Sequence, residues 1–184
     1  MATLHADERP LLAGTRRRLL TLVCATAAAV ASIARYDGGS RGFVAAFAAF
    51  VLVVLAAIDV ERRRVPNLIV LPAAVATFSA QVAIDPGRWW VWAAAAFGGA
   101  LVFFVFAVIS PGGIGMGDVK LMLLIGATLG PAMLAGILVG TVSAAIAGLA
   151  LIARYGQEGR RRSLPYVPFL AFGAIAALVL LRPK

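Results

Sequence analysis

The chain has 184 residues, of which 62% are hydrophobic and 14% are charged, and its formal net charge is +9. A soluble domain is about 45–50% apolar and about 25% charged, so this composition excludes an ordinary water-soluble fold and favours the lipid bilayer as solvent. The basic residues cluster in short segments between apolar runs and no groove-reading motif is present, which indicates anionic membrane lipids rather than nucleic acid as their partner.

Seven apolar segments, taken in chain order, approach the roughly 20 residues that a membrane-spanning helix needs. They are Leu19–Ala34, Gly42–Ile58, Leu68–Ile84, Trp89–Ile109, Val119–Leu129, Ala132–Ala153 and Pro165–Leu181. The fifth is too short to span alone, unless Gly130 and Pro131 bend the helix rather than end it. Continuous apolar runs lack the alternation of a membrane β-barrel. The sequence therefore predicts an all-α, polytopic integral membrane bundle with six to seven transmembrane helices.

The expected organisation is a cytoplasmic N-terminal tail at residues 1–18, followed by one membrane-embedded domain at residues 19–184 with its core at about 42–181. The first apolar segment has a second interpretation. Three arginines followed by Leu19–Ala31 are also typical of a signal peptide, with Ala29-Val30-Ala31 as the cleavage site. Cleavage would leave six spans and would not change the side on which later residues lie.

The distribution of Lys and Arg predicts the orientation of the chain in the membrane. With a cytoplasmic N-terminus, twelve of the 17 Lys and Arg residues fall on the inside. Those twelve are Arg9, Arg16, Arg17, Arg18, Arg62, Arg63, Arg64, Lys120, Arg154, Arg160, Arg161 and Arg162. Trp89, Trp90 and Trp92 would then lie near the outer interface, where indole rings are favoured. Asp59 and Asp118 would both lie at the cytoplasmic face.

Asp59 and Asp118 stand directly against membrane-grade apolar sequence, where an acid is costly to desolvate and is a candidate functional residue. Two neighbouring carboxylates cannot both ionise easily, so one keeps a proton at neutral pH. The ionised member could activate a water molecule for attack on a peptide carbonyl, while the protonated member donates toward the oxyanion and the leaving amine. The pair predicts an aspartyl protease that works at the bilayer surface.

The chain has few residues for other kinds of catalytic or metal-binding site. Cys24 and His5 are the one cysteine and the one histidine of the chain. A disulfide framework, a cysteine-based zinc site or a Ser-His-Asp triad cannot be assembled from them within one chain. The sequence therefore indicates neither a metal nor a cofactor.

Each acid also has a structural interpretation. Asp59 could be a surface acid that ends a helix, and Asp118 could cap the N-terminus of the following helix, a role compatible with catalysis. Lys120 could tune Asp118 or serve as a positive-inside anchor. Glu61 is a weaker candidate, whose expected role is charge balance with the neighbouring arginines.

The glycine-rich segment from Gly113 to Gly117 lacks the spacing of the dinucleotide fingerprint and of the nucleotide P-loop. Glycines there would instead let the backbone that carries Asp118 approach another helix or an extended substrate. Pro66 is expected in the first turn of the third span.

Three stretches carry specific patterns. In the first, Asp59 ends an apolar helix, with Glu61 two residues later and Pro66-Asn67 at seven and eight residues. The second is Gly-x-Gly-Asp-x-Lys-Leu, formed by Gly115, Gly117, Asp118, Lys120 and Leu121 and followed by residues 125–130. The third is residues 167–174, with its Pro-Phe and Gly-Ala pairs. Over roughly residues 45–180, the chain resembles the type IV prepilin peptidase (leader peptidase) family of integral-membrane aspartyl proteases.

The resemblance implies that Asp59 and Asp118 are catalytic and that Gly115, Gly117, Lys120, Pro66 and Asn67 support them. It implies a multi-pass protein of the cytoplasmic membrane that cleaves the short basic leader of prepilin-like precursors after a Gly, with its active site facing the cytoplasm. Arg62, Arg63 and Arg64 would repel such a leader, so we expect them to contact lipid.

Larger members of the family have a loop with two Cys-x-x-Cys pairs and also methylate the new N-terminus, so with Cys24 alone we expect peptidase activity only. The alternative function is a non-catalytic membrane transporter or a pilus or secretion assembly protein that uses the acids for ion binding or packing.

Overall fold

The computed structural model describes residues 14–109, 115–161 and 164–181, and this part of the chain forms helices and no strand. The elements are α1 (Thr15–Arg35), α2 (Ser40–Arg62), α3 (Asn67–Ile84), η1 (Pro86–Arg88), α4 (Trp89–Ile109), α5 (Met116–Leu129), η2 (Gly130–Ala132), α6 (Met133–Arg161) and α7 (Val167–Leu181). Each predicted span corresponds to one α-helix, which confirms the all-α membrane bundle. Gly113, Ile114 and the first 13 residues of the predicted tail lie outside the described residues.

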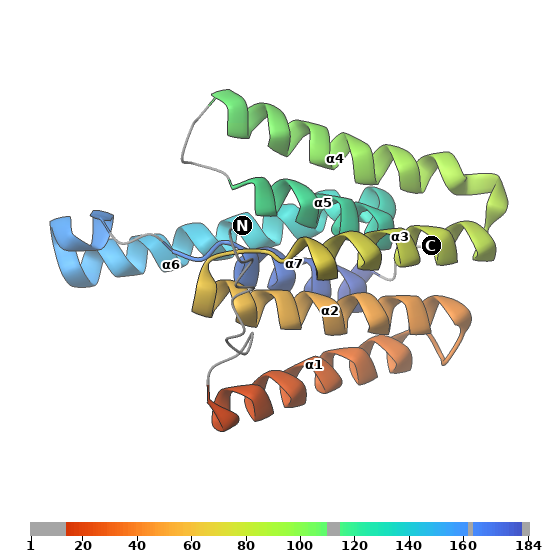
Figure 1. The fold of residues 1–184 in the computed structure, drawn as a ribbon, viewed down its shortest axis with the longest axis horizontal. Helices are drawn as coiled ribbons and strands as arrows, with labels where there is room; N and C mark the ends of the chain where they lie inside the picture. Colours follow the sequence, from red (N-terminus) through yellow and green to blue (C-terminus); the bar gives the residue numbers. More distant parts are fainter. Residues whose placement is uncertain (1–13, 110–114, 162–163, 182–184) are drawn as a thin grey trace, which may run out of the picture.

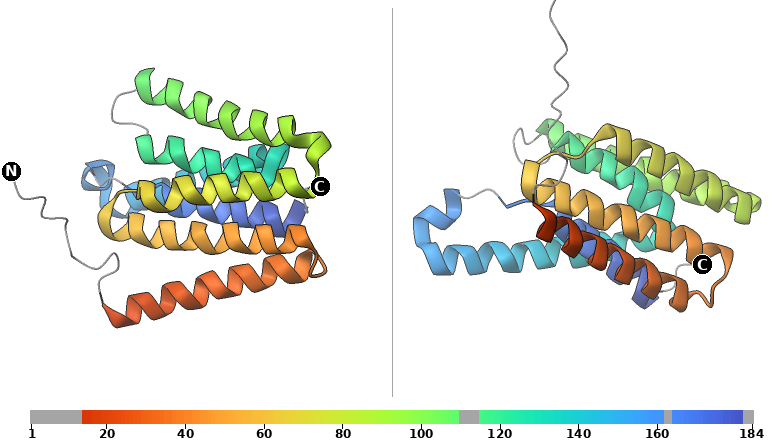
Figure 2. Two further views of the ribbon diagram at one scale, coloured as in Figure 1. Left: turned by 45° about the vertical axis from the view of Figure 1, so that its right-hand side comes forward. Right: turned by 60° about the horizontal axis from the view of Figure 1, so that its bottom comes forward.

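Consecutive helices run in opposite directions through the bundle (Figures 1 and 2). The start of α1, the ends of α2 and α4 and the starts of α3, α5 and α7 therefore lie at one end. Asp59 lies close to the end of α2 and Asp118 close to the start of α5. The topology alone thus brings the two acids, 59 positions apart in the sequence, to the same end of the molecule.

The described residues contain five apolar helical stretches that are long enough to cross a membrane. One of them, 41 residues from Met116 to Gly156, includes α5, η2 and α6. The chain reverses direction at η2 (Figure 1), so Gly130 and Pro131 end α5 rather than bend it. With 14 residues, α5 is about 21 Å long, less than the roughly 30 Å of a bilayer core.

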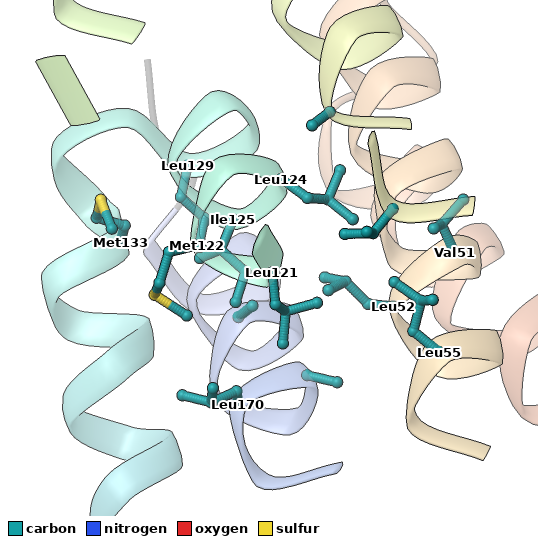
Figure 3. Packing of buried hydrophobic residues seen from close by; sticks show 14 of the residues in the cluster. Val51, Leu52, Leu55, Leu121, Met122, Leu124, Ile125, Leu129, Met133 and Leu170 are labelled. Atoms are coloured by element: carbon teal, nitrogen blue, oxygen red, sulfur yellow. The ribbon is translucent and has the colours of Figure 1, made fainter. Parts of the chain in front are cut away.

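The short helix α5 lies at the centre of the bundle, and nine of its residues are buried. Figure 3 shows Leu121 and Leu124 of α5 directed toward Leu52 and Leu55 of α2, with Leu170 of α7 below them. A helix that is apolar on all sides is expected where protein surrounds it. By contrast, α1 and α4 expose many large apolar side chains, as expected of helices that face lipid.

Small residues allow close contact between α6 and α7. A Cβ atom on Gly136 would lie 3.3 Å from the backbone of Gly173, and one on Gly140 would lie 2.8 Å from the carbonyl oxygen of Phe169. Membrane helices associate through such close backbone packing. This contact packs α7 closely against α6.

The tryptophans divide between surface and core. Trp89 and Trp90 are exposed at the end of the bundle opposite the acids, but Trp92 is only 1% exposed. Its ring lies against Gly130, and the Arg88 guanidinium lies 6.0 Å from the ring centroid. The Trp92 side chain therefore points inward and fills the space beside η2, a packing role that was not predicted from the sequence.

Candidate active site

The end of α2 presents Asp59. Arg63 adopts a left-handed conformation (φ 52°, ψ 41°) and donates its N–H to the Asp59 carbonyl oxygen at 2.8 Å, which ends the helix. A short extended segment leads to Pro66, and α3 begins at Asn67. Pro66 thus lies one residue before the helix, as its N-cap, rather than inside the first turn as predicted. This tight connection holds the Asp59 end of α2 beside the start of α3.

Asp118 is the third residue of α5 and bonds to the start of its own helix. Its Oδ2 accepts the Gly115 N–H at 3.2 Å, while its own N–H donates to the Gly115 carbonyl at 3.0 Å. This is the acidic half of a capping box, and Gly115 has no side chain to complete the other half. An acid in a first turn also interacts favourably with the helix dipole. Asp118 thus bonds to the N-terminus of α5 from inside the first turn, whereas the prediction placed it ahead of the helix.

Gly117 lets the start of α5 approach the connection between α2 and α3. A Cβ atom added to Gly117 would lie 2.9 Å from Cγ2 and 3.1 Å from Cβ of Val65. A Cβ atom added to Gly115 would meet only ordinary contacts, with Asp118 Oδ2 at 3.6 Å as the nearest atom. The two motif glycines therefore differ: Gly117 permits a close approach between elements, and Gly115 does not.

A second contact joins the two motifs. The Lys120 ammonium group donates to Asn67 Oδ1 at 2.8 Å, linking α5 to the first residue of α3. Through this hydrogen bond Lys120, which is partly buried, links the two helices. Both residues were predicted as members of separate motifs, and the structure brings them into direct contact.

Both carboxylates line one pocket of about 670 Å³. Its lining contains every site residue predicted from the sequence: Asp59, Pro66, Asn67, Gly115, Gly117, Asp118 and Lys120. Asp59 and Asp118 are close enough to interact electrostatically. The pocket therefore combines two interacting acids with polar groups from the starts of α3 and α5.

The arginines that follow Asp59 also line this pocket, a position that was not predicted for them. The Arg63 guanidinium is close enough to Asp59 to attract its carboxylate. Glu61 is outside the pocket lining, and its carboxylate forms an ion pair of 3.7 Å with Arg17 of α1. Of the three acids near these motifs, Asp59 and Asp118 line the pocket and Glu61 does not.

Sequence reasoning missed the helix N-terminus behind Asp59. The backbone N–H of Val167, the first residue of α7, donates to Asp59 Oδ2 at 3.3 Å. Asp59 is 7% exposed and Val167 is 2% exposed. The stretch that begins at Val167 was noted only as a family-like pattern, and nothing in its sequence signals a contact with a residue 108 positions earlier.

Within the ranges that the structure describes, no three His, Cys, Asp or Glu side chains converge as a metal site would require.

Comparison with known proteins gives two matches. The sequence model of the Type IV leader peptidase family matches residues 46–180, which include the whole pocket. Over 131 residues, the chain is 32% identical to the prepilin leader peptidase/N-methyltransferase of Bacillus subtilis (strain 168), covering 68% of this chain and 51% of that protein. The chain thus spans about half the length of this curated relative. No solved structure matches.

Proposed function

The chain belongs to the type IV leader peptidase family, and from this premise we propose that it is a membrane aspartyl endopeptidase that removes the leader peptide of type IV prepilin-like precursors. The observation that carries the proposal is the position of Asp59 and Asp118, which come from different helices and line one pocket at one end of the bundle. Cleavage after a Gly follows from the family resemblance.

In the proposed mechanism, the two carboxylates share one proton and hold one water molecule between them. The ionised carboxylate takes a proton from the water as its oxygen attacks the peptide carbonyl carbon, and the other donates toward the developing oxyanion. Collapse of the tetrahedral intermediate breaks the C–N bond, and a carboxyl proton passes to the leaving amine. The pair titrates as a unit, so the proton is not assigned to either residue.

The surroundings of the acids support this chemistry. One oxygen of Asp59 accepts a hydrogen bond from the N–H of Val167, and one oxygen of Asp118 accepts a hydrogen bond from that of Gly115. Hydrogen bonds from backbone donors to a carboxylate are strong and directional. Each acid is therefore held at one oxygen, and this pre-orients the pair for attack on a bound peptide.

The proposed location is the cytoplasmic membrane, with the pocket facing the cytoplasm. The support is the predicted excess of Lys and Arg on that side. Arg62, Arg63 and Arg64 line the pocket, and such a basic cluster attracts the anionic headgroups of the cytoplasmic leaflet. In a Cys24→Ala background, Asn67→Cys should react with a membrane-impermeant maleimide only after the cells are opened. Labelling of intact cells would contradict this orientation.

The test of function uses two isosteric variants and one matched control. Asp59→Asn and Asp118→Asn should each abolish processing of a co-expressed prepilin while the protein still accumulates in the membrane. Glu61→Gln, two residues after Asp59 but outside the pocket lining, should process the precursor at the wild-type rate. Normal cleavage by either Asp variant would rule out the dyad, whereas no cleavage by the wild-type protein would favour a non-catalytic transporter or assembly protein.

A further inference from the structure

The first turn of α7 lies against the Asp59 side chain. The Val167 N–H at the start of this helix is hydrogen-bonded to Asp59 Oδ2, and both residues are buried. A displacement of this turn would therefore move the hydrogen-bond donor that orients the carboxylate.

Tyr166 joins this turn to α6. Its carbonyl oxygen accepts the N–H groups of Phe169 and Leu170 at 3.1 and 3.2 Å, so Tyr166 caps the helix that begins at Val167. Its phenolic oxygen forms a hydrogen bond of 2.9 Å with Thr141 Oγ1 on α6. One residue thus caps α7 and attaches the cap to the neighbouring helix.

The hydroxyl pair is exposed on the outside of the bundle, within an apolar stretch of α6. Thr141 belongs to the run Met133–Ala153 of α6, which contains no charged residue. Where lipid covers this surface, no water is available to replace a lost partner, so the interhelical hydroxyl pair has few alternatives. The nearby contact of Gly140 with the Phe169 backbone keeps the two helices packed without the hydroxyls.

We propose that Thr141 and Tyr166 are positioning residues for Asp59. Their hydrogen bond fixes the first turn of α7 on α6, and the Val167 N–H of that turn orients the Asp59 carboxylate toward the pocket. The kinetic consequence rests on the proposed peptidase function, whereas the effect on the helix turn does not.

The kinetic test removes one hydroxyl at a time from the full-length protein. Thr141→Val and Tyr166→Phe should each lower kcat for prepilin cleavage by about threefold to eighteenfold, the factors that correspond to the mean and maximum strengths of interhelical hydrogen bonds in membranes. KM should not change. Thr141→Ser, which keeps the hydroxyl, should restore kcat. The double variant should be no slower than the slower single variant, because both changes remove the same bond.

Ser143→Ala is the matched control. The Ser143 hydroxyl lies on the same helix but donates to the Gly140 carbonyl of α6 itself, at 2.8 Å. Its removal should leave kcat unchanged. An equal loss in this control would assign the effect to α6 as a whole and overturn the proposal.

Amide hydrogen exchange at Val167 gives a readout that does not depend on cleavage. Exchange should be faster in Thr141→Val and Tyr166→Phe than in wild type and Ser143→Ala. Unchanged exchange at Val167 would overturn the proposal. Faster exchange with an unchanged kcat would also overturn it, and so would a kcat for Thr141→Ser as low as that of Thr141→Val. Normal cleavage by Asp59→Asn would instead refute the proposed function, while the exchange rates would still decide whether the hydroxyl pair holds the turn.

Discussion

Replacing Gly117 with alanine is expected to move the start of α5, which carries Asp118, away from the connection that follows Asp59 and α2. The added Cβ atom would lie 2.9 Å from Val65 Cγ2, about 0.5 Å short of the 3.4 Å at which ordinary contact begins. Rotation of the Val65 side chain can move Cγ2, but its Cβ atom at 3.1 Å cannot move without the backbone. The start of α5 must therefore shift away from the connection between α2 and α3.

The structure sets the expected size of this effect. A displacement of 1 Å at an active site can lower the rate by about 100-fold, so a shift of about 0.5 Å predicts a loss of roughly tenfold in kcat. Overpacking costs about 1–3 kcal/mol, but alanine is favoured over glycine in a helix by about 1 kcal/mol. The free energy of unfolding should therefore fall by no more than about 2 kcal/mol.

The assay measures initial rates of prepilin cleavage by purified protein, with membrane abundance as the check on folding. Gly115→Ala is the control, because its Cβ atom would meet only a contact of 3.6 Å. Val65→Ala added to Gly117→Ala removes the 2.9 Å contact but keeps the Cβ atom at 3.1 Å, so it should restore the rate only in part. A wild-type rate for Gly117→Ala, or an equal loss for Gly115→Ala, would refute the reasoning.

Three further predictions follow from other contacts. Glu61→Gln should leave the cleavage rate unchanged, and a loss as large as that of an Asp59 variant would place this acid in the mechanism. Lys120→Met and Asn67→Ala should each lower the rate by a few-fold, and the double variant should lose no more than one single variant because both remove the same 2.8 Å hydrogen bond. Gly173→Leu should reduce membrane abundance, since its side chain would meet the α6 backbone, whereas Gly98→Leu, with no atom within 4 Å, should not.

Much of the fold could be predicted from the sequence because helices in lipid must satisfy their backbone hydrogen bonds internally. Apolar runs therefore correspond closely to helices, and Trp89–Ile109 was predicted with the bounds that the structure shows. Alternating helix directions then place Asp59 and Asp118 at one end. All of the predicted site residues line the same pocket, because both motifs border connections at that end.

Contacts between distant segments could not be predicted in this way. The direction in which the Trp92 side chain points depends on the packing of α4 against η2. A tryptophan is equally compatible with burial in the bundle and with exposure at the membrane interface. The Asp59–Val167 hydrogen bond and the Thr141–Tyr166 pair depend on the register of α7 against its neighbours. That register is set by glycine contacts whose partners a single sequence does not reveal.

The central claim is that Asp59 and Asp118 act together on one water molecule. Its most direct test compares single-turnover cleavage of a prepilin by Asp59→Asn, Asp118→Asn and the double variant, at equal protein concentration. Residues that act as a unit show non-additive losses, so the double variant should be no slower than the slower single variant. A double variant slower by the product of the two single losses would contradict a shared catalytic step.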